Sequence, residues 1–206
     1  MNSSESNARI LSSAGTDHIG HRAAANLRYI RDTIDAVQTF TLVPGRGCVW
    51  MGLVALLAAT LELLPEFAEQ WLSLWLAAAV IAGAIGLYEM AEKARREGIS
   101  LRRSSATRFF MTLAPAFSVG AILTAALLDT VPRDVIAGIW LLSYGAGLAA
   151  CGVFSIPVVL IAGGAFIGLG AVTLTAPASW SPMLLAVGFG LIHIVLGFLV
   201  MRRYGG

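Results

Sequence analysis

The sequence predicts an all-α integral membrane protein with six transmembrane helices, and three observations lead to this fold class. First, 57% of the 206 residues are hydrophobic and only 13% are charged, whereas soluble domains are about 45–50% apolar and about 25% charged. Second, apolar runs of about 20 residues recur along the chain, and a helix needs this length to cross roughly 30 Å of hydrocarbon. Third, these runs do not alternate polar and apolar residues, as the strands of a membrane β-barrel would.

The boundary between the fourth and fifth spans is the hardest to place, because no charged residue marks it. A single helix over 135–175 would be about twice the length of a span. A tight turn is therefore expected within 151–157, where Pro157 follows a glycine-containing stretch and can begin the next helix. The transmembrane domain, 48–206, is then expected to have spans at 48–64, 72–90, 109–128, 135–153, 155–175 and 183–201.

Two segments precede the predicted membrane domain. Residues 1–20 are polar and small, so they are expected to form a disordered tail. Residues 21–47 predict a cytoplasmic amphipathic helix that ends in a Pro-Gly connector at 44–47, since proline cannot continue a helix. Its apolar side chains recur at helical spacing, at Leu27, Ile30, Ile34 and Val37. This face would lie either on the membrane surface or on the protein itself.

Basic residues are sorted to one side of the predicted membrane domain. With six spans, Arg133 is the only one of the 14 Lys and Arg residues that falls on the other side. Because cytoplasmic segments carry the excess of basic residues, both termini are predicted to be cytoplasmic, in a multi-pass protein of the cell (inner) membrane.

The basic residues nearest the spans are expected either to set this topology alone or to contact anionic lipid headgroups and partners. They are Arg28, Arg31, Lys93, Arg95, Arg96, Arg102 and Arg103. The basic loop is short and has no aromatic residue, so no nucleic-acid partner is expected.

The spans fall into three hairpins that have proline and glycine at similar positions. Proline lies near the cytoplasmic entry of the first, third and fifth spans, at Pro44, Pro115 and Pro157, and a glycine follows within each span. A proline there costs little, since the first N–H groups of a helix have no partner within it. We therefore consider a pseudo-threefold repeat of parallel hairpins. The alternative is a chance alignment of residues that are common in all membrane helices.

One histidine, His193, lies in the otherwise apolar sixth span, on the same helical face as Gly190 and Gly197. Small residues mark faces where membrane helices approach closely, so His193 is expected to point into the bundle. A polar group there is either functional or hydrogen-bonded to a neighbouring helix. Tyr144 in the fourth span and Glu89 at the end of the second are the other members of this candidate intramembrane site.

The sequence contains no HExxH, P-loop or GxSxG motif, and it has two cysteines. No catalytic residue, metal site or cofactor is therefore predicted. The fifth span has a GxxxG pattern, Gly164 to Gly168, which is typical of helix packing and is compatible with a homo-oligomer.

Three stretches carry a resemblance to a family of small bacterial six-span membrane proteins to which no activity is attached. They are "NLRYIRDTIDAVQTFTLVPGRG" before the first span, "SYGAGLAACGVFSI" in the middle and "LIHIVLGFLVMRRYGG" at the end. The resemblance implies a recurrent fold over most of the chain from about residue 24, and it implies no activity, ligand or site.

Three functions remain open on the sequence alone. The first is a non-catalytic membrane protein, such as a scaffold, sensor or regulatory subunit, that contacts partners or lipids from the cytoplasmic face. The second is a small transporter or channel for a neutral or weakly polar solute. The third is an intramembrane enzyme or cofactor-binding subunit that uses His193. Absence of a carboxylate deep in any span speaks against ion-coupled transport.

Overall fold

The computed structural model describes residues 26–27, 42–98 and 105–204. The chain divides into two units, Met1–Gln38 and Thr39–Gly206. In the first unit, Asn26 and Leu27 are helical. The predicted tail at 1–20 and most of the predicted amphipathic helix lie outside the described residues, as do Arg28, Arg31, Arg102 and Arg103.

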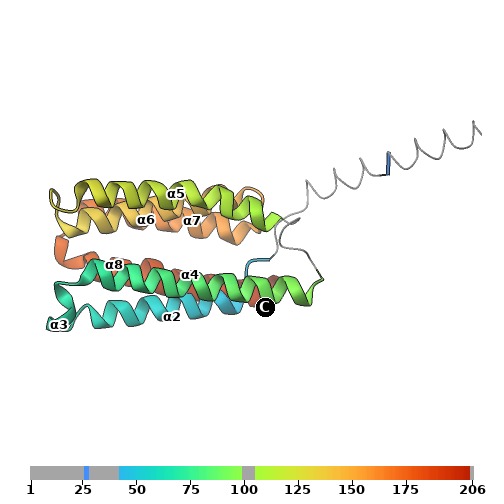
Figure 1. The fold of residues 1–206 in the computed structure, drawn as a ribbon, viewed down its shortest axis with the longest axis horizontal. Coiled ribbons are helices and arrows are strands. Elements are labelled where there is room, and N and C mark those ends of the chain that lie inside the picture. Colours follow the sequence, from blue (N-terminus) through green and yellow to red (C-terminus); the bar gives the residue numbers. More distant parts are fainter. Residues whose placement is uncertain (1–25, 28–41, 99–104, 205–206) are drawn as a thin grey trace, which may run out of the picture. The chain divides into compact units, whose positions relative to one another are not determined.

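The described part of the second unit is all-helical, and five of its helices are long and apolar enough to cross a membrane (Figure 1). Four of them are α4 (Trp71–Arg96), α5 (Ser105–Leu127), α6 (Arg133–Gly152) and α7 (Pro157–Thr175). The fifth runs over Ala178–Tyr204 and consists of η1 (Ala178–Trp180), α8 (Ser181–Leu185), the π-helical segment η2 (Ala186–Ile192) and α9 (His193–Tyr204). The composition-based prediction of an all-α membrane protein agrees with this architecture.

A sixth apolar helix, α2 (Gly45–Leu61), has 17 residues and is followed by the short α3 (Pro65–Ala68). It begins before the predicted span, so the predicted Pro-Gly connector is instead the N-cap and first turn of α2. The physical reason is close packing, because a Cβ at Gly45 would lie 3.0 Å from the carbonyl oxygen of Gly197 on α9. The turn expected at 151–157 is present, since α6 ends at Gly152 and α7 begins at Pro157.

The helices pack in two groups. α6 packs most extensively on α7 and then on α5, whereas α2 packs on α4 and on η2 and α9. Figure 1 shows α5, α6 and α7 on one side of the unit and α2, α4 and α8 on the other. Contacts of α8, η2 and α9 with α6 or α7 join the two groups. The main partner of α7 is therefore α6, and not the helix that would complete the third predicted hairpin.

Glycines set the close approach between α6 and α7. A Cβ at Gly163 of α7 would clash with the backbone of Ala149, and a Cβ at Gly145 of α6 would lie 2.8 Å from the backbone nitrogen of Ile167. The GxxxG residues of the sequence, Gly164 and Gly168, instead face open space within this chain. The GxxxG pattern thus lies on α7, which does pack closely through glycine, but it does not mark the face of α7 that meets α6.

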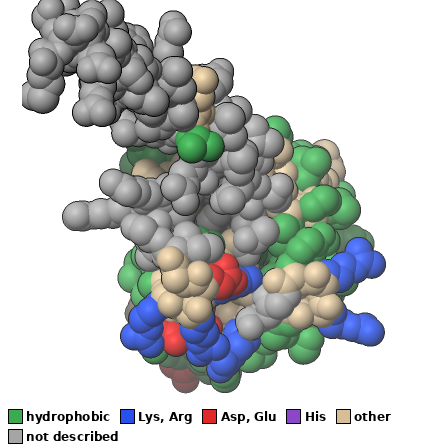
Figure 2. All heavy atoms as spheres, turned by 90° about the vertical axis from the view of Figure 1, so that its right-hand side faces the viewer, with side chains coloured by type: hydrophobic (Ala, Val, Ile, Leu, Met, Phe, Trp, Pro, Cys, Tyr) green, Lys and Arg blue, Asp and Glu red, His purple; other side chains and the backbone are tan. Residues whose placement is uncertain are grey.

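Charged side chains lie at the ends of the helices. Figure 2 looks onto one end and shows Lys and Arg side chains gathered there with Asp and Glu side chains among them. α2 runs antiparallel to α9, with Gly45 beside Met201 and Gly52 beside Gly190, so the start of α2 and the end of α9 share this basic end. Among the described residues, Arg133 is the one Lys or Arg at the opposite end.

Candidate functional site: an aromatic cavity

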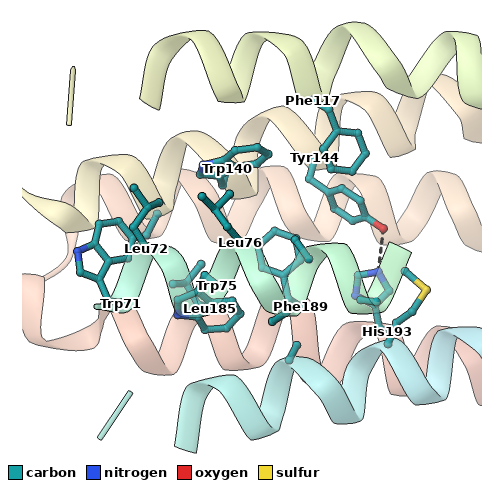
Figure 3. Close-up of a pocket in the computed structure, with 16 residues that line it drawn as sticks. Trp71, Leu72, Trp75, Leu76, Phe117, Trp140, Tyr144, Leu185, Phe189 and His193 are labelled. Carbon is teal, nitrogen blue, oxygen red and sulfur yellow. Dashed lines mark hydrogen bonds between the residues drawn. The ribbon is translucent and has the colours of Figure 1, made fainter. Parts of the chain in front are cut away.

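A cavity of about 120 Å³ lies between the two helix groups and is here called the aromatic cavity. Residues of α2, α4, α5, α6, α8, η2 and α9 line it, and Figure 3 shows its larger side chains. Its aromatic walls are Trp71, Trp75, Phe117, Trp140 and Phe189. Tyr144 and His193 also line it. It is therefore mostly apolar, with a few polar groups, which is the usual form of a small-molecule site.

His193 and Tyr144 form a hydrogen-bonded pair at one end of the aromatic cavity (Figure 3). Tyr144 Oη lies 2.8 Å from His193 Nε2, and the two residues are 8% and 3% exposed. The structure thus brings together two of the three residues of the candidate intramembrane site.

An aromatic cluster holds this pair in place. The ring of Phe166, which is fully buried, lies 4.8 Å from the ring of Tyr144 and 5.4 Å from that of His193, between centroids. Phe189 stacks on His193 at 6.3 Å. Such edge-on and stacked pairs contribute about 0.5–1.5 kcal/mol each beyond their buried area. The orientation of both polar rings is therefore fixed by packing as well as by their hydrogen bond.

The π-helical segment η2 ends directly before His193. π-helical turns are rare and occur often at functional sites. Within η2, a Cβ at Gly188 would lie 2.6 Å from Leu141 of α6, and one at Gly190 would lie 2.5 Å from Leu56 of α2. The segment is therefore wedged between both helix groups, which positions Phe189 and His193 on the cavity side.

The second ring nitrogen of His193 has no hydrogen-bond partner in the part of the chain that the structure describes, although it is buried. The carbonyl groups of Gly188 and Phe189 in the preceding π-helical turn lie close enough to interact with this ring as weak acceptors, but neither meets hydrogen-bond geometry at Nδ1. A buried polar atom without a partner costs about 1–3 kcal/mol, so its presence needs a reason.

The indole N–H groups of two cavity walls, Trp75 and Trp140, donate to partners that do not line the cavity. Trp140 Nε1 donates to Thr124 Oγ1 at 2.9 Å, and Trp75 Nε1 donates to Glu62 Oε2 at 2.8 Å. Glu62 is 6% exposed and also faces Arg133 at 3.7 Å. These two walls thus present their apolar faces to the cavity, and Glu62 anchors Trp75 at the end of the domain opposite the basic end.

Two substitutions of Glu62 distinguish the contributions that its partners Trp75 and Arg133 make to stability. Glu62→Gln keeps an acceptor for Trp75 but loses the charge that Arg133 meets. We expect it to change the unfolding free energy by less than about 1 kcal/mol, because the Arg133 side chain is 44% exposed and solvent screens its 3.7 Å contact. Glu62→Leu leaves the Trp75 N–H without its partner and is expected to cost about 2 kcal/mol. Denaturant titration of the purified protein measures both. Equal losses in the two variants would contradict this order and make Arg133 the dominant partner.

The third member of the candidate intramembrane site lies elsewhere. Glu89 lines a second, shallow hollow with Trp50 and Tyr88, and it is not among the residues of the aromatic cavity. Its position follows from helix length, since α4 places it near the basic end of the domain while His193 lies midway along the last helix.

The predicted helix-packing and lipid-contact residues also separate into groups. Gly190 and Gly197 pack on α2, as close neighbours of Leu56 and Val49. Lys93 turns inward, with a side chain 11% exposed, and donates to the carbonyl oxygen of Val43 at 3.4 Å.

Two of the predicted lipid-contact residues remain at the surface. Arg95 and Arg96 pair with Glu92 and have side chains 78% and 60% exposed. They are the described members of the predicted lipid-contact set whose side chains are mostly exposed.

Sequence reasoning missed the aromatic walls of the cavity. Two signals could have indicated them: Trp71 and Trp75 are four residues apart on α4, and Phe189 and His193 are four residues apart across η2. Residues at this spacing share one helix face. In addition, no group of three or more His, Cys, Asp or Glu side chains that could hold a metal occurs among the described residues.

No family model, curated protein or solved structure matches the chain.

Proposed function

We propose that this chain is a non-catalytic, multi-pass membrane protein that binds a small lipophilic molecule in the aromatic cavity, as a sensor or regulatory subunit does. The observation that carries this proposal is the cavity of about 120 Å³ with its aromatic walls. An engineered protein cavity of about 150 Å³ binds benzene, so the size suits one ring. Tyr144 and His193 engage each other, which supports a role in binding more than one in catalysis.

The topology proposed for the membrane domain has six spans, of which α2 is the first, with both ends on the cytoplasmic side of the inner membrane. α2 has 17 residues, which is at the short end of the range for spanning helices, about 17–25 residues. The gathering of basic side chains at one end supports the orientation. The pseudo-threefold repeat stays a prediction, and the packing of α7 on α6 weighs against it.

Two contacts with partners are proposed from the surface. Arg95 and Arg96 would meet anionic lipid headgroups at the basic end. The exposed face of α7 at Gly164 and Gly168 would meet a second copy of the chain.

A carrier for a neutral or weakly polar solute is the second candidate function. The aromatic cavity extends from Trp71, at the outer end of α4, to His193, midway along the last helix, and such a cavity could form the outer half of a pathway. None of its lining residues lies in the helix turns that bear Lys93, Arg95 or Arg202. Binding without passage is therefore the better-supported function. An enzyme that uses His193 stays the third alternative.

The binding function is tested by titrating fluorobenzene into the purified full chain in lipid nanodiscs and following its ¹⁹F resonance. Saturable binding is expected for the native chain. Ala82 lines the cavity from α4, so Ala82→Phe places a ring inside it and is expected to weaken binding about tenfold or more.

Ala77→Phe is the matched control, because Ala77 lies on the same helix, is exposed and does not line the cavity. It is expected to bind fluorobenzene like the native chain. Absence of saturable binding to the native chain, or equal weakening by both variants, would refute a binding function of this cavity.

A further inference from the structure

The hydrogen bonding of the Tyr144–His193 pair leaves one donor unused. A neutral imidazole has one N–H and one acceptor nitrogen, and a phenol has one O–H. If Tyr144 donates to Nε2, the remaining donor is Nδ1–H of His193. If Nε2–H donates instead, the remaining donor is the hydroxyl of Tyr144. Nδ1 is buried and has no partner in hydrogen-bond geometry among the described residues. A ligand atom that accepts a hydrogen bond can therefore use the spare donor of the pair, whichever tautomer is present, once a small rotation of the imidazole or the hydroxyl turns that donor toward the aromatic cavity.

The side of the aromatic cavity that is not covered by protein faces the region that lipid would fill. Leu76 of α4 and Phe117 of α5 both line the cavity, and they are 45% and 41% exposed. Leu76 lies about 8 Å and Phe117 about 15 Å along their helices from the outer ends, at 1.5 Å per residue. α4 packs extensively on α2 and has no comparable packing on α5. A molecule at this opening would therefore be in contact with hydrocarbon.

We propose that the aromatic cavity binds an uncharged, lipid-soluble compound with a single flat ring and a carbonyl or hydroxyl oxygen, which accepts a hydrogen bond from the Tyr144–His193 pair. This inference rests on the proposed binding function and adds the ligand class to it. The ring is recognised by the faces of Trp75, Phe117 and Phe189, since aromatic pairs favour stacked and edge-on contacts. The oxygen supplies the partner that the pair lacks.

An acyl chain of a membrane lipid is the main competing occupant, because the cavity is apolar and open to hydrocarbon. An acyl chain offers no acceptor to the pair, and it would gain nothing specific from flat aromatic walls. The two occupants are thus distinguished by whether an oxygen on a ring changes the affinity.

The test compares 4-fluoroacetophenone with its alkene isostere, 4-fluoro-α-methylstyrene, in ¹⁹F titrations of the full chain in phospholipid nanodiscs. Partitioning into protein-free nanodiscs is measured for both and subtracted. We expect the ketone to bind about threefold to tenfold more tightly than the alkene, the range of one net hydrogen bond. In the double variant Tyr144→Phe/His193→Phe, which keeps an aromatic ring at both positions but removes the donors, we expect the ketone to lose its advantage, so that the ratio of the two affinities falls to about one.

The outcomes separate the two proposals. Equal affinities of ketone and alkene for the native chain would overturn the ligand class and leave the binding function standing. Absence of binding by both compounds and by fluorobenzene would overturn the binding function itself. 4-Acetylbenzoate, in which a carboxylate replaces the fluorine of the same ketone, is expected not to displace 4-fluoroacetophenone in a ¹⁹F competition titration. Comparable binding of this anion would place the opening in water and would also overturn the inference.

Discussion

Replacing Gly163 with alanine is expected to lower the free energy of unfolding by about 2–3 kcal/mol, the range of overpacking in a closely packed interior. An ideal Cβ at Gly163 would clash with the backbone nitrogen of Ala149 and would lie 2.7 Å from its Cα. Backbone cannot rotate away as a side chain can, so α6 and α7 must separate. The contact between these two helices is the most extensive in the domain. Unfolding by denaturant in detergent micelles measures the loss.

The neighbouring residue provides the control for this experiment. Gly164 has nothing within 4 Å of an added Cβ and is exposed, and alanine is favoured over glycine in a helix by about 0.5–1 kcal/mol. Gly164→Ala is therefore expected to be neutral or stabilising. Changes of opposite sign in the unfolding free energy at Gly163 and Gly164 would verify which face of α7 is turned toward α6. A loss of stability at Gly164 of the same size in micelles that hold one copy of the chain would refute that orientation of α7, whereas a loss that arises only when two copies associate would agree with the proposed contact at Gly164 and Gly168.

The fold class could be predicted from the sequence because it depends on length and composition. A helix that crosses hydrocarbon needs about 20 apolar residues, and a charged residue marks most ends of such runs, as Arg133 does for α6. The turn between Gly152 and Pro157 was also predictable, since two spans cannot share one uninterrupted helix of twice the required length. These features are properties of one segment at a time.

The aromatic cavity was not predictable in the same way, because it depends on how helices are rotated and shifted relative to one another. The GxxxG pattern illustrates the difference: Gly164 and Gly168 satisfy it, yet Gly163 makes the contact. Burial does not discriminate among faces in an apolar helix, since lipid and protein interior are both apolar. The sequence indicated His193, Tyr144 and Glu89 as candidates because all three are polar residues in or near the spans. It could not indicate that His193 pairs with Tyr144 while Glu89 lies elsewhere.

The π-helical segment η2 is a second reason why the aromatic cavity could not be predicted from the sequence. Ala186–Ile192 contains two glycines and no proline or charged residue, and nothing in this composition separates a π-helical turn from an α-helical one. The distinction depends on neighbours, Leu141 and Leu56, that press against Gly188 and Gly190 from two helices. The side-chain directions of Phe189 and His193 therefore follow from tertiary packing, and the cavity that they line follows with them.

Replacing Phe166 with alanine is expected to cost about 3 kcal/mol of unfolding free energy, within the range for truncation of a buried phenylalanine. Phe166 is fully buried and lies 4.8–5.4 Å, ring to ring, from Tyr144, Phe189 and His193. In a bilayer the apolar transfer term is small, so the loss arises from the empty volume and from missing dispersion contacts. Ile167→Ala removes an adjacent side chain that is 38% exposed and is expected to cost less than about 1 kcal/mol.

Rescue by a small molecule distinguishes lost volume from other damage in the Phe166→Ala protein. The missing ring leaves a space next to the aromatic cavity, and benzene at saturating concentration is expected to restore part of the stability, since a ligand that binds only the folded state stabilises it. The same concentration should affect Ile167→Ala no more than the native chain. Without selective rescue, the ring would act by orienting the Tyr144–His193 pair and not by filling space, and the hydrogen bond between the two would then carry the stability of this region.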